Sequence, residues 1–157
     1  MLRIALVFSA LLALPALADG ADQAAVARIH AGIVDCPGCR LEGADLSNTC
    51  VKGRDLHGAD FDRADAHLMC MSYADFSGAS FRGTDLSAAN LSHAKLDGAD
   101  LTGANLERAD LRGATLRNAI LRDANLERAR VEDANLDGAD LREANLEDVR
   151  GLRRERD

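Results

Sequence analysis

The sequence predicts an all-β solenoid, in which the chain coils around a narrow interior instead of folding into a globule. Three observations lead to this fold class. The 157 residues are 47% hydrophobic but only 3% aromatic, so small and medium side chains must fill the core. Apolar residues recur every five positions, a period that neither a helix nor a straight strand keeps on one face. Glycines fall where each repeat needs a corner.

The first segment, residues 1–18, is typical of a secretory signal peptide. Arg3 gives it a positive start, an apolar run extends from Ile4 to Leu14, and Ala16-Leu17-Ala18 forms a small-residue cleavage site. The apolar run is shorter than the roughly 20 residues of a membrane span. We therefore expect an exported protein, periplasmic or extracellular after cleavage near Ala18, with no stable membrane anchor.

The net charge and the absence of known motifs argue against several classes of function. Removal of residues 1–18 takes away one arginine and no acid, so the net charge changes from −7 to −8. An acidic surface repels phosphates, and we expect no nucleic-acid partner. The sequence contains no nucleophile–base pair, phosphate loop or metal motif, so we expect no enzyme, no metal site and no cofactor.

Residues 34–149 form the predicted solenoid, and each repeat has the same order of residue types. A small residue is followed by Asp or Asn, then by a large apolar residue, then by two polar residues or glycines. The small and the large residue are two positions apart and share the inward face, provided that each repeat turns a corner. The large positions form the predicted core ladder: Leu41, Leu46, Val51, Leu56, Phe61, Phe76, Phe81, Leu86, Leu91, Leu96, Leu101, Leu106, Leu111, Leu116, Leu121, Leu126, Val131, Leu136, Leu141 and Leu146.

The tandem motif Ala-(Asp/Asn)-Leu-x-x, as in Ala99-Asp100-Leu101 and Ala104-Asn105-Leu106, resembles the pentapeptide repeat family. It recurs in one phase as about 23 repeats, far more than chance would give. The resemblance implies a right-handed quadrilateral β-helix with four repeats per coil and about six coils. Phe61 and Phe81 are four repeats apart, so a coil of this length would stack them inside one face.

Both ends of such a solenoid expose strand edges and need covers. Residues 19–33 form the expected N-terminal cap segment, in which a short helix over Ala24–Ile33 lays Val26 and Ile29 on the first coil. Residues 150–157 form a charged tail that caps poorly. We expect the last coil either to fray or to be covered by a second copy in a homodimer.

Four cysteines in an exported protein favour disulfides. In coils of four repeats, Cys50 and Cys70 occupy stacked outward positions about 4.8 Å apart and would pair as a rung. Cys36 and Cys39 flank Pro37-Gly38, the preferred centre of a type II turn, which brings them within disulfide range. A cross-pairing such as Cys36 with Cys50 stays open, and a CxxC redox or metal site is the functional alternative.

Two positions depart from the core pattern. Ala66 occupies a large slot and Met69 a small one, which we interpret as an exchange of volume. Arg54 occupies a small inward slot, where an unpaired buried cation would be costly. Either the first coils are irregular, or Arg54 extends outward to Asp35 or Asp55.

Two corner slots that elsewhere hold glycine or polar residues contain Leu68 and Tyr73. We expect both side chains outside the solenoid, together with the nearby His67 and His93. These four residues form either a patch for a protein partner or a set of scattered surface residues.

The sequence thus favours an exported, non-enzymatic structural or protein-binding scaffold whose partner is unknown. Two alternatives stay open. Some pentapeptide repeat proteins bind DNA gyrase by imitating duplex DNA, so the resemblance and the acidic charge imply a topoisomerase interaction protein, which the signal peptide opposes. The other alternative is a periplasmic thiol/disulfide protein that uses the Cys-Pro-Gly-Cys motif at 36–39.

Overall fold

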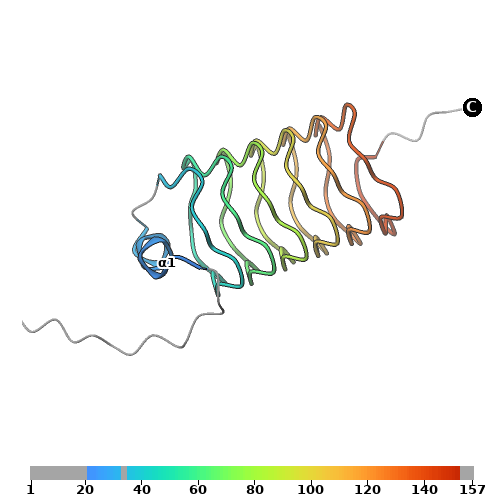
Figure 1. The fold of residues 1–157 in the computed structure, drawn as a ribbon. Coiled ribbons are helices and arrows are strands. Elements are labelled where there is room, and N and C mark those ends of the chain that lie inside the picture. Colours follow the sequence, from blue (N-terminus) through green and yellow to red (C-terminus); the bar gives the residue numbers. More distant parts are fainter. Residues whose placement is uncertain (1–20, 33–34, 153–157) are drawn as a thin grey trace, which may run out of the picture.

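The computed structural model describes residues 21–32 and 35–152, so the expected signal peptide lies outside the described residues. Stacked coils form one elongated solenoid, with the single helix of the described chain, α1 (Gln23–His30), at the N-terminal end (Figure 1). The sides of the coils are too short to form regular strands and are joined by isolated bridges. Within the described ranges, no helix has the length and apolar character needed to cross a membrane.

Successive coils are joined by backbone hydrogen bonds between positions about four repeats apart. Parallel bridges begin with Arg40 opposite Asp60 and continue, repeat by repeat, until Arg150. The large apolar residue of each repeat donates its N–H to the next coil, as from Leu106 N to Asn125 O at 2.7 Å. The residue before it donates to the preceding coil. These bonds confirm the expected coil of four repeats and make each coil the template for its neighbours.

Each side ends in a tight turn. In one repeat, Ala104 N donates to Leu101 O at 3.0 Å and Gly103 has a φ of 66°, the pattern of a type II turn. The glycines expected at corners have positive φ, as predicted. Other corners hold side-chain-bearing residues at φ between 53° and 61°, among them Leu68 and Tyr73. An L-residue in this region costs roughly 1 kcal/mol, so glycine is favoured there but not required.

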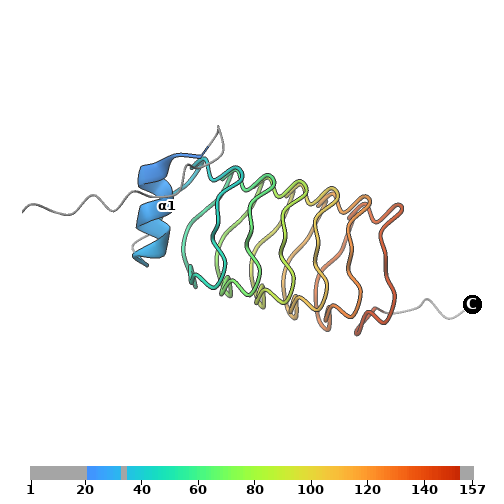
Figure 2. The same cartoon turned by 90° about the horizontal axis from the view of Figure 1, so that it is seen from below.

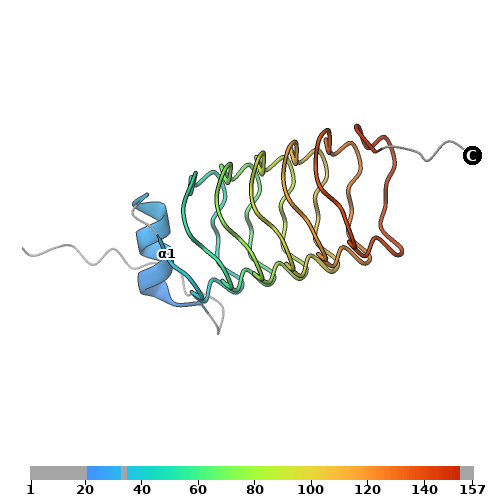
Figure 3. The ribbon, with the colours of Figure 1, turned by 90° about the horizontal axis from the view of Figure 1, so that it is seen from above.

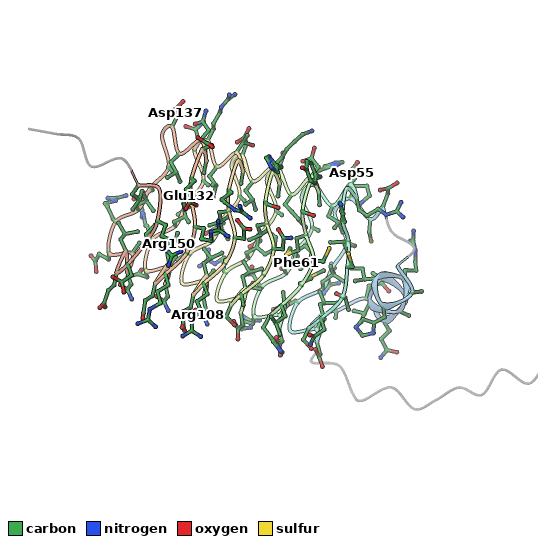
Figure 4. The ribbon with its side chains drawn as sticks, turned by 180° about the vertical axis from the view of Figure 1, so that it is seen from behind. Asp55, Phe61, Arg108, Glu132, Asp137 and Arg150 are labelled. Atoms are coloured by element: carbon green, nitrogen blue, oxygen red, sulfur yellow. The ribbon has the colours of Figure 1, made fainter. Side chains whose placement is uncertain are left out.

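The interior is filled by the predicted ladder, which is fully buried along most of the solenoid. Phe61 and Phe81 stack one coil apart, as expected, with ring centroids separated by 4.7 Å. Phe76 packs edge-on against both rings, with its centroid 5.7 Å from Phe61 and 5.4 Å from Phe81. Figure 4 shows Phe61 inside the coils, while Asp55 and Arg108 lie on opposite edges.

The irregular core positions do not disturb the register. Ala66 and Met69 are both fully buried, consistent with an exchange of volume. Arg54 N donates to Val51 O at 3.1 Å, and Arg54 O accepts from Asp75 N at 2.9 Å. Of the two alternatives, irregular first coils are therefore wrong here. Among the described residues no ion pair joins Arg54 to Asp35 or Asp55, although its side chain does extend outward. The side chain of Arg54 is exposed, because burial of an unpaired cation would cost several kcal/mol.

The N-terminal end is covered by α1, which lies across the first coil (Figure 2). Asp22 caps the helix by accepting a hydrogen bond from Ala24 N at 2.9 Å, and Val26 and Ile29 are buried, as expected for a cap. The helix starts one residue before the predicted segment Ala24–Ile33 and ends at His30, three residues before the predicted end, because Ala31 and Gly32 form a turn.

The opposite end of the solenoid is open among the described residues (Figure 3). Leu136 and Leu141 are only partly buried and Leu146 is 39% exposed, so the predicted burial of the ladder is wrong in the last coil. No further described coil packs on these side chains, and a hollow of about 700 Å³ lies beside them. The register itself continues to Arg150, one residue beyond the predicted end at 149. The homodimer expected at this end stays a prediction.

Leu106→Asp is predicted to unfold the middle coils, because Leu106 is completely buried and the new carboxylate would have no partner. We expect a loss of more than about 4 kcal/mol in the free energy of unfolding, measured by urea denaturation. Leu106→Met is the matched control and should cost less than about 1.5 kcal/mol. Equal stability of Leu106→Asp and the wild type would contradict the inward position of Leu106.

Candidate functional site

One side of the solenoid differs from its neighbours in the residues that point outward. Its column of bridging residues begins with Cys50 and Cys70, which face each other across one coil spacing, and continues with Asn90. We call this side, with its two bordering corners, the cysteine face. At the corresponding places the preceding side carries Asp45 and Asp65, and the following side carries aspartates as well. The cysteine face therefore interrupts the acidic surface near the N-terminal end.

The two corners that border Cys70 carry large apolar side chains. Leu68 precedes this side and Tyr73 follows it; Leu68 is 54% exposed and Tyr73 is 58% exposed. Both residues have positive φ, 56° for Leu68 and 61° for Tyr73. Each therefore combines backbone strain with exposed apolar surface, and neither contributes to the interior.

Tyr73 belongs to a row of side chains along its corner. Its ring stacks on His93 in the next coil, with ring centroids 4.9 Å apart and an interplanar angle of 17°. Lys52 Nζ lies 5.7 Å from the Tyr73 ring centroid on the other side. His93 occupies the space over Gly113, where an added Cβ would lie 2.5 Å from His93 Nδ1. Lys52, Tyr73 and His93 thus form a row of neighbouring side chains that ends over Gly113.

The other corner of the cysteine face has a shallow hollow beside Leu68, with a volume of about 260 Å³. It is lined by His67, Leu68, Ser87, Ala88, Glu107 and Arg108. His67 Nδ1 lies 2.6 Å from Asp65 Oδ1, and this hydrogen bond raises the pKa of His67. The four patch residues expected from the sequence therefore form two groups, His67 with Leu68 and Tyr73 with His93, on neighbouring corners.

Sequence reasoning missed Lys52, Gly113 and the hollow at Ala88. The signal was present, because Tyr73, His93 and Gly113 follow one another at intervals of four repeats. The sequence written in rows of four repeats, one below the other, would have placed them in one column. It would not have given the direction of each side chain.

The cysteines form two separate pairs, and all four are thiols in this structure. Cys39 N donates to Cys36 O at 3.2 Å across Gly38, which has a φ of 66°, so the predicted type II turn is present. Cys36 is buried in the first coil, whereas Cys50 is exposed on the outside. This separation favours pairing within each pair over the cross-pairing of Cys36 with Cys50. The disulfides themselves stay predictions.

The surroundings of Cys36 and Cys39 disfavour a reactive CxxC motif. Burial raises the pKa of the Cys39 thiol, and the adjacent Cys36 thiol raises it further. A cysteine that attacks other molecules needs a lowered pKa, and Arg28 lowers the pKa of Cys39 less than burial and Cys36 raise it. Here the motif forms a turn between two sides of a coil.

Most polar side chains on the outer surface, including Asn90 and Glu107 of the cysteine face, are occupied by local bonds. Asp45 Oδ1 accepts from Ser47 N at 3.1 Å, and equivalent bonds recur along the Asp/Asn columns. Glu107 pairs with Arg108 at 3.4 Å, and the next coil repeats this ion pair. Among the described residues, no three His, Cys, Asp or Glu side chains gather as metal ligands.

Gly113→Ala tests the row along the Tyr73 corner. Gly103→Ala is the matched control, since both glycines have φ near 65° but no atom lies within 4 Å of a Cβ at Gly103. We expect both variants to lose about 1 kcal/mol through the strained backbone. Gly113→Ala should lose roughly 0.5–1 kcal/mol more, because His93 must leave Tyr73. This difference should vanish in a His93→Ala background, and its persistence in thermal unfolding there would contradict the packing.

Comparison with known proteins gives one family and several solved structures. Residues 39–87, 70–108, 84–123 and 109–148 match the family described as pentapeptide repeats, in eight copies. No curated protein matches the chain. Among solved structures, the pentapeptide repeat protein Rfr23 from the cyanobacterium Cyanothece 51142 is 36% identical, over 55% of this chain and 58% of that one, with a TM-score of 0.42.

The pentapeptide repeat protein alr5209 from Nostoc Pcc 7120 is 44% identical, over 51% of this chain and 62% of that one, with a TM-score of 0.44. QnrB1, a plasmid-mediated fluoroquinolone resistance protein, is 21% identical over 69% of this chain and 77% of that one, with a TM-score of 0.38. The chain thus spans about three fifths of the first two proteins. The matched repeats extend over most of the sequence, and the chain belongs to the pentapeptide repeat family.

Proposed function

We propose that this protein is an exported, non-enzymatic scaffold that binds a partner protein through the cysteine face. In this proposal the solenoid is a right-handed quadrilateral β-helix of about six coils, which serves as a stiff support. The partner contacts Leu68 and the hollow on one corner and the Tyr73–His93 stack on the other.

The observation that carries the proposal is the placement of Leu68 and Tyr73. Each is more than half exposed at a corner with positive φ, where glycine would avoid the strain. Eleven other corner residues besides glycine also have positive φ, so it is the exposed apolar surface of Leu68 and Tyr73 that distinguishes these two corners and supports a binding site. Leu68 and Tyr73 lie at the two ends of one side of a single coil, so a partner with a flat binding surface could contact both.

The distribution of charges on the neighbouring sides also supports the cysteine face as the binding surface. Aspartates line the sides on either side of the cysteine face, whereas the column between its corners has thiols and Asn90. Desolvation of thiols and amides costs much less than desolvation of carboxylates. This face is therefore the part of the N-terminal half that a partner could cover at the lowest cost.

The double variant Leu68→Gly/Tyr73→Gly separates binding from folding. Glycine relieves the strain at both corners, so we expect stability within about 1 kcal/mol of the wild type even though the Tyr73–His93 stack is lost. Binding should fall sharply. In-cell crosslinking from a photoreactive residue at Asn90 should capture one partner in the wild type and lose it in the double variant.

Two controls accompany this experiment. Asp123→Gly makes the same change at a positive-φ corner away from the cysteine face, and it should keep the crosslink. A photoreactive residue at Arg82, which is exposed on the opposite side, should give no crosslink to the same partner. A crosslink that survives the double variant would refute the proposed face.

Export is tested independently by fractionation and N-terminal sequencing. We expect the periplasmic or extracellular protein to begin at Asp19, directly after Ala18. Uncleaved protein in the cytoplasm would contradict export and favour the alternative function as a topoisomerase interaction protein. Inhibition of gyrase supercoiling would then be the assay.

A further inference from the structure

The two cysteine pairs differ in how easily another molecule reaches them. Cys36 is only 8% exposed and Cys39 is partly covered, in the first coil beneath α1. Cys50 is exposed on the outward side of a bridge, and Cys70 beside it is partly exposed. Thiol–disulfide exchange requires a thiolate to reach a sulfur atom, so accessibility decides which bond reacts.

The environment of the outer pair suits an incoming thiolate. The neighbouring sides present aspartates at the same level, but the bridging column of this face continues with the neutral Asn90. The positive charge of Lys52 acts on the Cys70 thiol and lowers its pKa slightly, against the larger effects of burial and Cys50. An anion therefore approaches this sulfur pair against less repulsion than on the adjoining sides.

Leu68 and Tyr73 flank Cys70 in the sequence and in space, since they occupy the two corners of its side. A protein that docks on both side chains would cover the outer cysteines. Its own thiol would then be held next to Cys50, at a high effective concentration.

We infer that Cys50 and Cys70, paired as a disulfide in the exported protein, form a thiol–disulfide exchange site, and that Cys36–Cys39 is the structural staple. The co-reactant is a dithiol on the docked partner protein. This inference deepens the proposed function, since it assigns redox chemistry to the same face.

The exchange has two balanced steps. A partner thiolate attacks Sγ of Cys50, forms a mixed disulfide and breaks the Cys50–Cys70 bond, and the Cys70 thiolate leaves and takes up a proton. The second partner thiol, as its thiolate, then attacks the partner sulfur of the mixed disulfide and releases Cys50. Two electrons pass from the partner, which becomes a disulfide, to the cysteine pair, which becomes two thiols.

The raised pKa of Cys70 slows its departure as a leaving group, so accessibility and not leaving-group ability selects Cys50 as the attacked sulfur. The released Cys70 is also a poor attacking group. Burial raises the pKa of the Cys70 thiol, and its hydrogen bond with the Cys50 thiol raises it further. At neutral pH Cys70 is therefore protonated and attacks the mixed disulfide slowly, because only the thiolate is nucleophilic. The mixed disulfide persists long enough for the second partner thiol to react.

Reduced glutathione is the probe for the site itself. The oxidised, exported full chain is incubated with glutathione, quenched with an alkylating agent and mapped by mass spectrometry. We expect Cys50–Cys70 to be reduced at least about tenfold faster than Cys36–Cys39, with glutathione attached to Cys50. Equal rates, faster reduction of Cys36–Cys39, attachment mainly to Cys70, or the absence of a Cys50–Cys70 disulfide would each overturn the inference.

Single cysteine variants provide a matched pair. On incubation with oxidised glutathione, the exposed Cys50 thiolate of Cys70→Ser should attack the glutathione disulfide, release one glutathione thiolate and form a mixed disulfide, whereas Cys50→Ser leaves the less exposed Cys70 and should form much less. Thermal unfolding checks that both variants fold. Equal attachment of glutathione to two folded variants would overturn the assignment of Cys50 as the accessible sulfur that is attacked.

The glutathione assay also separates this inference from the proposed function. Leu68→Gly/Tyr73→Gly should leave exchange with glutathione unchanged, since a small thiol needs no docking, but should abolish the crosslink from Asn90 to the partner. Normal exchange with glutathione, together with an undiminished crosslink, would refute the docking face and leave the exchange site standing. Slow exchange with glutathione in the wild type would overturn the exchange site alone.

Discussion

The structure depends on one repeated constraint, the pair of backbone hydrogen bonds that each repeat makes with the coils above and below. The N–H of each large apolar residue points to the next coil and the N–H before it points to the preceding one. This arrangement fixes the length of each coil at four repeats and turns small and large residues inward together. It also aligns the outward positions in straight columns. The register therefore determines which side chains lie next to each other on the outer surface.

Because the columns are straight, side chains stacked in one column must be compatible in charge and hydrogen bonding. The Asn column of one side solves this with an amide ladder, in which Asn125 donates to Asn105 at 3.2 Å and Asn145 donates to Asn125 at 3.0 Å. Stacked glutamates are compensated by adjacent arginines. On the cysteine face the Glu107–Arg108 pair lies at the Leu68 corner, but Cys50, Cys70 and Leu68 take part in neither an amide ladder nor an ion pair and remain available to another molecule.

The sequence predicts those features that every repeat imposes. The coil length, the core ladder, the turn at Cys36–Cys39 and the exchange of volume at Ala66 and Met69 all follow from periodicity and side-chain size. Features that depend on a position departing from the repeat pattern, or on its particular neighbours, are harder to predict from the sequence. Arg54 leaves the interior without disturbing the register, and Leu146 is exposed because no described coil covers it. Exposed corners have no packing partner that dictates a rotamer, so the stack of Tyr73 on His93 required the structure.

The inter-coil hydrogen bonds can be observed directly by NMR, through scalar couplings from an amide nitrogen to the carbonyl carbon that accepts its hydrogen bond. The structure predicts a correlation between Leu106 N and the Asn125 carbonyl carbon, and one repeat later between Leu111 N and the Arg130 carbonyl carbon. A correlation from Leu106 N to the Ile120 carbonyl carbon would instead indicate a coil of three repeats. Such a result would contradict the register on which the core, the corners and the cysteine face all depend.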